Sequence, residues 1–168
     1  MKEHIIHPIP PFYDKESRIL ILGSFPSVKS REQMFFYGHP QNRFWKVLAQ
    51  IFEDDVPDTV ADKKEFLARH HVALWDVIGE CDIKGSSDSS IENVKANDLS
   101  LILNAADISG IFVNGKTAEK YYRKYIENET GRTAVCLPST SPANAAWKTE
   151  ELVRVWKEEI CRGECDPG

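Results

Sequence analysis

The sequence predicts a three-layer α/β/α fold in which a central, mostly parallel four-stranded sheet lies between layers of helices. Patterns typical of strands and helices alternate along the chain, and such alternation requires crossover connections between parallel strands. Residues 19–22 read Ile-Leu-Ile-Leu and precede a glycine, which is typical of a strand buried on both faces. A chain of 168 residues suits one hydrophobic core, so we expect one domain over residues 1–168.

The first half of the chain contains two predicted strands and two predicted helices. A long loop follows the strand at residues 19–22, and a helix begins near Asn42. The apolar side chains that recur there at helical spacing are Phe44, Trp45, Leu48, Ile51 and Phe52. Asp58 and Thr59 offer an N-cap for a second helix that ends near His70, and residues 72–75 form the second strand.

The second half continues the alternation with two more strands and three helices. Asn97 or Asp98 caps a helix that continues through Leu103. The later elements are a strand at residues 108–113, a helix at 117–126, a strand at 133–137 and an amphipathic helix at 149–161. The Gly-Ser-Ser-Asp-Ser-Ser run at residues 85–90 is expected to be a solvated loop, and the alternative is that Ser86, Ser87 and Ser89 contact phosphates.

Composition and charge limit the classes of function. The net charge of −5 argues against a protein that binds nucleic acid nonspecifically over a large basic surface. It does not exclude an enzyme that binds a few phosphates through backbone amides. The apolar run at residues 18–23 is too short to span a bilayer, and the first residues lack the apolar region of a secretory signal. We therefore expect a cytoplasmic protein, without membrane association, that acts as a monomer.

The four cysteines do not form a metal-ligand pattern. Cys81 and Cys136 lie in apolar sequence, and Cys161 and Cys165 have no histidine or second cysteine pair at ligand spacing. The chain also contains neither a Gly-x-Gly-x-x-Gly fingerprint nor a Walker A loop. We expect no metal, no nucleotide cofactor and no other cofactor.

The unusual sequence lies directly after the predicted strands, where ligands bind in parallel α/β sheets. The segments expected to converge are residues 23–27, 76–78, 114–115 and 138–144. Three stretches stand out: Gly-Ser-Phe-Pro-Ser at 23–27, Tyr-Gly-His-Pro-Gln-Asn-Arg-Phe-Trp at 37–45, and Leu-Pro-Ser-Thr-Ser-Pro-Ala-Asn at 137–144. In this order they resemble the first motif, the His-Pro-x-Asn-Arg-Phe-Trp segment and the DNA-inserting second motif of the uracil-DNA glycosylase superfamily.

Two departures from the superfamily pattern indicate one branch. Phe25 stands where most members carry the Asp or Asn that orients the attacking water, and Leu137 stands where a His or Asn often steadies the leaving base. A chain without both groups resembles the hypoxanthine-DNA (DNA-deoxyinosine) glycosylase branch, which implies that Asn42 is catalytic. The chemistry is compatible, because an amide carbonyl can accept a hydrogen bond from water and position it. The alternative is that Asn42 only caps the following helix.

The resemblance also implies a base-binding set of Phe25, Tyr37 and Asp76. Tyr37 matches the aromatic position on which the extruded base stacks, although Phe35 or Phe36 are alternatives. Asp76 follows the second strand, where relatives carry a base-reading Asn. Its carboxylate would accept the N1–H of hypoxanthine and repel the N1 lone pair of adenine. The alternatives are a structural Asp that caps a turn, or base reading by main-chain groups near Phe25.

The segment at 137–144 is expected to contact DNA. Ser139 and Ser141 would bond phosphates, while Pro142 and Ala143 would form the wedge that enters the helix, assisted by Asn144 or the backbone. Without the resemblance this segment would be an ordinary Ser/Pro turn.

The expected activity is therefore that of a metal-independent, monofunctional glycosylase that hydrolyses the N-glycosidic bond of deaminated bases in DNA. Hypoxanthine is the expected base, and an abasic site is the expected product. The alternatives are a uracil-, xanthine- or mismatch-specific glycosylase, or a non-catalytic module that binds damaged DNA.

Overall fold

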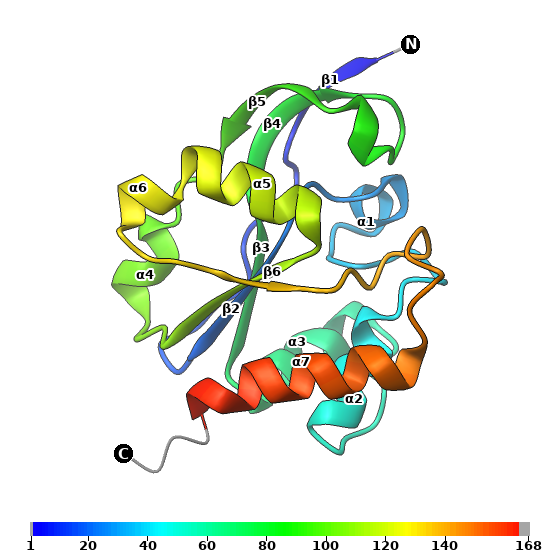
Figure 1. The fold of residues 1–168 in the computed structure, drawn as a ribbon, viewed down its shortest axis with the longest axis vertical. Helices are drawn as coiled ribbons and strands as arrows, with labels where there is room; N and C mark the ends of the chain where they lie inside the picture. The colour runs from blue at the N-terminus through cyan, green and yellow to red at the C-terminus, as the bar shows by residue number, and fades with distance from the viewer. Residues whose placement is uncertain (1, 165–168) are drawn as a thin grey trace.

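The computed structural model describes residues 2–164 and contains a central four-stranded sheet (Figure 1). The strands lie in the order β3-β2-β6-β7, and every neighbouring pair is parallel. They are β2 (Ile19–Gly23), β3 (Val72–Asp76), β6 (Gly110–Asn114) and β7 (Val135–Leu137). The predicted sheet is confirmed, and its four strands lie at the four predicted positions.

Helices cover both faces of this sheet because β2 is apolar on both sides. Ile19 and Ile21 pack on one face, and Leu20 and Leu22 pack on the other. The helices of the first face are α2 (Phe44–Ile51), α3 (Val60–Arg69) and α7 (Thr149–Glu164), and those of the second face are α4 (Ser100–Ala105) and α5 (Lys116–Tyr125). This is the predicted three-layer arrangement.

Local sequence explains where these helices begin. Thr59 and Asp62 form a reciprocal capping box at α3, in which each side chain accepts the other residue's backbone N–H. The α2 helix starts two residues after Asn42, whose side-chain oxygen accepts the backbone N–H of Phe44. The cap expected at Thr59 is therefore confirmed, whereas the N-cap of α2 is Arg43 and not Asn42, which lies one residue before it.

A second sheet was not predicted. It is three-stranded and antiparallel, in the order β1-β4-β5, and packs beside the second face of the central sheet. Its strands are β1 (Glu3–Ile6), β4 (Ile78–Ile83) and β5 (Glu92–Ala96). Register shifts interrupt the β4–β5 pairing, and β1 and β5 are mostly exposed, so no clean apolar alternation marks them in the sequence.

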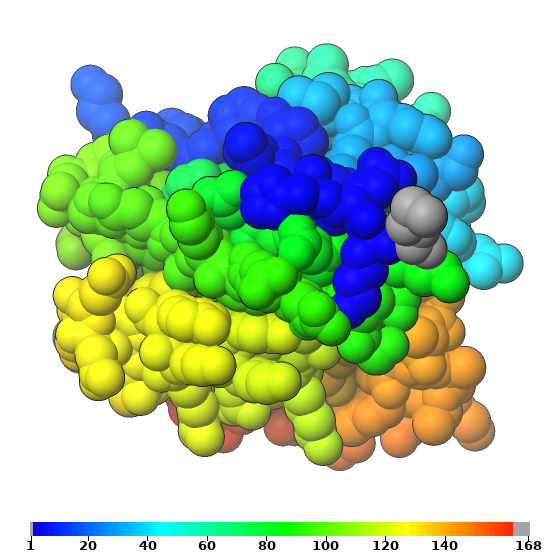
Figure 2. All heavy atoms as spheres, turned by 90° about the horizontal axis from the view of Figure 1, so that it is seen from above, coloured from blue at the N-terminus to red at the C-terminus, as the bar shows by residue number. Residues whose placement is uncertain are grey.

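The amino-terminal segment crosses the molecule and joins the two sheets. Figure 2 shows it lying across the region of β4 and β5, in agreement with the β1–β4 pairing. Beyond β1 the chain forms a bridge between Phe12 and Leu74 of β3. Residues 7–9 therefore lie close to the carboxyl end of β3.

The sequence also did not predict two short helices, α1 (Val28–Gln33) and α6 (Glu127–Thr130). Each spans fewer than seven residues, which is too short for helical periodicity to mark it. Within the described residues no helix is both long and apolar enough to cross a membrane.

The carboxyl ends of β2 and β3 meet at a glycine. Gly23 pairs with Asp76, and a Cβ added to Gly23 would lie 2.5 Å from Asp76 Oδ1 and 3.1 Å from the Tyr37 hydroxyl oxygen. Glycine is required here by this close approach, because any other residue would displace the carboxylate.

Gly23→Ala is therefore expected to destabilise the protein by about 1–3 kcal/mol, the usual cost of overpacking a buried site. Urea unfolding with linear extrapolation measures this change. Asp76→Ala should cost less in the Gly23→Ala background than in the wild-type chain, because it removes the obstructing carboxylate. Additive costs would show that this contact does not constrain the site.

Candidate active site

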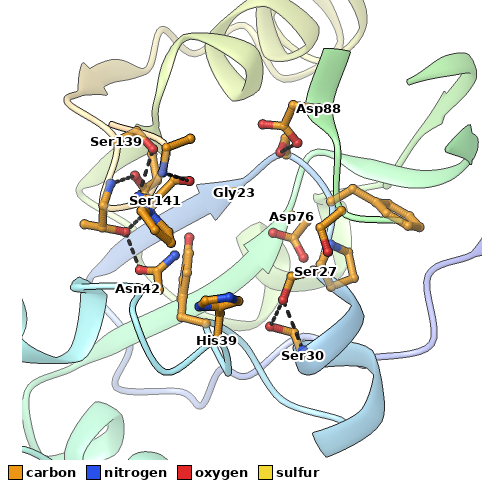
Figure 3. A pocket seen from close by; sticks show the side chains of 18 of the residues that line it. Gly23, Ser27, Ser30, His39, Asn42, Asp76, Asp88, Ser139 and Ser141 are labelled. Carbon is orange, nitrogen blue, oxygen red and sulfur yellow. Dashed lines mark hydrogen bonds between the residues drawn. The ribbon is translucent and has the colours of Figure 1, made fainter. Parts of the chain in front are cut away.

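The segments that follow the four parallel strands converge on one pocket of about 520 Å³ (Figure 3). Its lining includes residues from the ends of all four strands and from the loop at residues 37–42. The strand-end residues among them are Gly23, Phe25, Asp76, Asn114, Ser139 and Ser141. The sequence prediction that these segments meet is confirmed.

Asp76 forms part of the floor of this pocket. Its Oδ1 lies over Gly23, and its backbone carbonyl accepts a hydrogen bond of 2.8 Å from Asn97 Nδ2. Its other carboxylate oxygen, Oδ2, lies 2.7 Å from His7 Nε2, and both side chains are almost fully buried, at 5% and 3% exposure. Asp76 therefore presents one oxygen toward the pocket and one toward the protein interior.

Sequence reasoning did not identify His7. It precedes all the superfamily-like segments and lies in a stretch without a strong strand or helix pattern. The only available signal was a histidine in the sequence Ile-Ile-His-Pro-Ile-Pro, which has many other interpretations.

Aromatic rings form the apolar part of the site. Phe25 is buried, lines the pocket and packs edge-on against His7 at a ring distance of 5.7 Å. Arg31 lies over its ring at 5.8 Å. Phe25 is thus placed where the sequence predicted it, with a ring that bounds the pocket and no group that could orient water.

Tyr37 presents a ring to the pocket. The ring stacks on Phe44 with centroids 3.8 Å apart and an interplanar angle of 15°. Its backbone is left-handed, with φ +54°, an unusual conformation for a non-glycine residue that often marks functional sites. Burial, reinforced by the negative charge of Asp76, raises the pKa of the Tyr37 hydroxyl. The hydroxyl oxygen is buried and has no hydrogen-bond partner among the described residues.

Asn42 reaches the pocket from the loop before α2, and a chain of hydrogen bonds fixes its amide. Thr140 N–H donates to Asn114 Oδ1, so Asn114 Nδ2 must donate to Thr140 Oγ1, at 3.0 Å. The Thr140 hydroxyl then donates to Asn42 Oδ1 at 2.8 Å. Only one orientation of each side chain satisfies these bonds. The series runs from Asn114 at the end of β6, through Thr140, to Asn42.

The same oxygen of Asn42 accepts the backbone N–H of Phe44 at 3.0 Å. Both lone pairs of the amide carbonyl are therefore occupied, and the carbonyl is not free to hold water as the sequence argument assumed. In Figure 3 the dashed hydrogen bond of Asn42 leaves from the amide oxygen, and the amide nitrogen lies on the other branch of the side chain. Asn42 offers the pocket N–H donors.

The segment at residues 138–144 forms a tightly bonded loop. Ser139 Oγ accepts the backbone N–H of Ser141, and Ser141 Oγ accepts that of Ala143. Each hydroxyl thus acts as an acceptor within the loop and keeps its own hydrogen available. Gly115, with φ +97°, permits this loop to approach, because a Cβ there would lie 3.1 Å from Ser139 Cβ.

The proposed wedge residues lie at the tip of this loop. Pro142 and Ala143 line the pocket, and Ala143 is exposed. Asn144 does not line it; its side chain donates to Ser139 O at 2.9 Å, and its carbonyl accepts from Arg43. Arg43 also donates to Trp147 O at 2.6 Å, so it anchors the loop to α2.

The serine-rich loop forms another wall of the pocket, although the sequence favoured a solvated loop over one that contacts DNA. Its residues are exposed, as expected, but Ser86, Ser87, Asp88 and Ser89 also line the pocket. Ser24 Oγ donates to Asp88 Oδ1 at 3.2 Å. The surrounding protein desolvates the Asp88 carboxyl and raises its pKa; the Ser24 hydrogen bond opposes this shift, and the charge of Asp76 adds to it.

His39 lines the pocket, and its Nδ1 accepts the backbone N–H of Gln41 at 3.1 Å. This bond stabilises the loop before Asn42. Among the described residues, no group of three or more His, Cys, Asp or Glu side chains is arranged to hold a metal ion. Hydroxyl, amide, carboxylate and aromatic side chains line most of the pocket.

Comparisons with known proteins agree with this geometry. The sequence model described as the uracil DNA glycosylase superfamily matches residues 10–160. Proteins named hypoxanthine DNA glycosylase from Methanosarcina barkeri and Methanosarcina acetivorans are each 33% identical over 137 residues, which cover 80% of this chain and 85% of each relative.

A solution NMR structure of a candidate uracil DNA glycosylase from Methanosarcina acetivorans has the same fold. It matches with a TM-score of 0.74 and 30% identity over 92% of this chain and 98% of that chain. The family match includes all three segments that resemble superfamily motifs, and those segments lie together around the pocket. The chain belongs to the uracil DNA glycosylase superfamily.

Proposed function

We propose that this protein is a DNA glycosylase that hydrolyses the N-glycosidic bond of deoxyinosine, releases hypoxanthine and leaves an abasic site. The observation that carries the proposal is the Asp76 carboxylate, which lies on the floor of a pocket bounded by the ring of Tyr37. The names of the two Methanosarcina relatives support the same base.

Deamination changes the group that Asp76 would meet. Adenine has a lone pair at N1, whereas hypoxanthine has an N1–H donor beside its O6 carbonyl. A carboxylate only accepts hydrogen bonds, so Asp76 Oδ1 favours hypoxanthine and repels adenine. Guanine shares the N1–H, but a guanine paired with cytosine costs more to extrude than a mispaired hypoxanthine.

The Tyr37 ring provides a surface on which the extruded base can stack. Its stacking on Phe44 and its left-handed backbone hold the ring in one position. Stacking suits any base and is worth about 1–3 kcal/mol, so it contributes affinity while Asp76 contributes selectivity. A pocket of about 520 Å³ lies within the usual range for small-molecule sites.

Cleavage proceeds through a sugar with oxocarbenium character, which requires a well-placed water more than a strong base. An N–H of Asn42 holds that water through one lone pair and leaves the other free to attack C1′. The water oxygen bonds to C1′ as the bond to the base breaks, and the proton that the water loses is balanced by the proton that the departing base takes up. No lysine is found among the described residues that line the pocket, which favours water over an amine nucleophile.

DNA contact is assigned to the loop at residues 138–144. The free hydroxyl hydrogens of Ser139 and Ser141 suit phosphate oxygens, and Pro142 and Ala143 at its tip suit the space left by the extruded nucleotide. Asn144 contributes by holding the loop. We propose that the protein acts as a cytoplasmic monomer without cofactor; the sequence contains no nucleotide-binding fingerprint.

Uracil is the second candidate base, because its N3–H also lies beside a carbonyl group and the NMR structure belongs to a candidate uracil DNA glycosylase.

We expect the protein to release hypoxanthine faster than uracil or xanthine from otherwise identical duplexes. The strand should stay intact until alkali or heat is applied, and EDTA should not change the rate. Faster uracil release would overturn the base assignment, and binding without release would indicate a damage-binding module.

Asn42→Asp separates the two possible roles of the Asn42 side chain. Aspartate keeps an oxygen for Thr140 and Phe44 but replaces the pocket-facing N–H donors with an oxygen. We expect single-turnover release of hypoxanthine to fall about 100-fold, as for loss of one transition-state donor, while the free energy of unfolding stays near the wild-type value.

Asn42→Ala is the matched control, since it removes both functions. It should lose activity and also about 1 kcal/mol of stability with the hydrogen bonds from Phe44 and Thr140. If Asn42→Asp releases the base at the wild-type rate, the N–H donors of Asn42 do not act on the water.

A further inference from the structure

We infer that His7 is a positioning residue for base selection, which holds the Asp76 carboxylate so that one oxygen accepts the N–H group of the extruded base. The inference rests on the proposed function, in which Asp76 reads the base. His7 itself does not line the pocket, so it acts only through Asp76.

His7 is fixed on every side. Its backbone N–H donates to Gly79 O at 2.8 Å, and its side chain is 3% exposed. The rings of Phe25, Phe36 and Trp75 surround the imidazole at centroid distances of 5.7, 6.4 and 6.3 Å. The imidazole therefore has little freedom to turn.

One backbone contact determines which ring nitrogen carries the proton. Ile9 N–H donates to His7 Nδ1 at 3.2 Å, so Nδ1 must present its lone pair. The proton of the neutral ring then lies on Nε2, which donates to Asp76 Oδ2 at 2.7 Å. The direction of the His7–Asp76 hydrogen bond thus follows from the main chain.

This bond determines what Asp76 can offer to a base. With Oδ2 engaged by His7, the carboxylate cannot turn that oxygen toward the pocket, and Oδ1 remains over Gly23. The backbone of Asp76 is held separately by Asn97. The pocket floor therefore carries one acceptor in a fixed place, as recognition of a single N–H requires.

Stability alone does not explain the pair. Backbone bonds already attach this segment, through the β1–β4 pairing and the bond from His7 N to Gly79 O. A buried pair of polar side chains is seldom more stable than apolar residues of the same volume. Conversely, one member of the pair is a pocket-lining carboxylate and the other lies against its interior oxygen, which suits a role in recognition.

The test compares His7→Leu, which removes both polar atoms, with His7→Gln, whose amide N–H can replace Nε2–H. Single-turnover release is measured on matched duplexes that contain hypoxanthine, with substrate Kd and unfolding measured for every variant. His4→Leu is the matched control, because His4 lies in the same segment but is exposed and pairs with Glu80 and Asp82.

We expect His7→Leu to slow hypoxanthine release roughly 10- to 100-fold, the usual effect of losing a hydrogen bond to a charged group. His7→Gln should recover most of that loss, and His4→Leu should behave as wild type. In the Asp76→Ala background, His7→Leu should change the rate little, because both residues act as one unit. An equal loss in both backgrounds, or no recovery by His7→Gln, would overturn the inference.

Nitrogen-15 NMR of labelled histidine gives a readout that does not depend on activity. The His7 signals, assigned by their loss in His7→Gln, should show a protonated Nε2 and an unprotonated Nδ1, and Asp76→Ala should shift the Nε2 resonance. If wild type releases no base but shows these signals, the proposed function fails and the His7–Asp76 arrangement stands. If wild type releases hypoxanthine and the His7 variants match it, this inference alone fails.

Discussion

The close approach between Gly23 and the Asp76 carboxylate constrains the rest of the site. Because β2 and β3 are parallel and in register, their last residues face each other, and the missing side chain of Gly23 leaves room for Asp76 Oδ1. The Tyr37 hydroxyl lies over the same glycine, so one small residue positions an acceptor and a stacking ring together. The chemistry of the pocket therefore depends on the packing of a fully buried strand.

In the proposed mechanism, the site relies on orienting groups where many hydrolases use a strong base. Two chains of hydrogen bonds lead into the pocket from opposite sides: Ile9 to His7 to Asp76, and Asn114 to Thr140 to Asn42. In the first chain the backbone N–H of Ile9 donates to His7 Nδ1, and in the second the backbone N–H of Thr140 donates to Asn114 Oδ1. These backbone groups determine which side-chain atoms donate and which accept. Such preorganised groups lower the barrier without reorganising during the reaction.

Strong local patterns made the central fold predictable. The apolar run of β2 and the capping residues before α3 each allow few interpretations, and the strand-end rule then located the pocket. The antiparallel sheet was not predictable, because β1 pairs with a strand far along the chain and register shifts interrupt the β4–β5 pairing. The contact between His7 and Asp76 likewise joins residues that lie far apart in the sequence. The occupied carbonyl of Asn42 depends on Thr140, 98 residues away. Motif resemblance could place Asn42 in the site but could not orient its amide.

The most direct test removes from the base the N1–H group that Asp76 is proposed to recognise. Hypoxanthine and unsubstituted purine share a ring outline, but purine has a lone pair at N1 and lacks the O6 carbonyl. Their single-turnover release is compared in identical duplexes, with wild type and with Asp76→Ala. The account predicts that wild type prefers hypoxanthine by about tenfold or more and that Asp76→Ala loses most of that preference. An unchanged preference in Asp76→Ala would contradict base reading by the carboxylate.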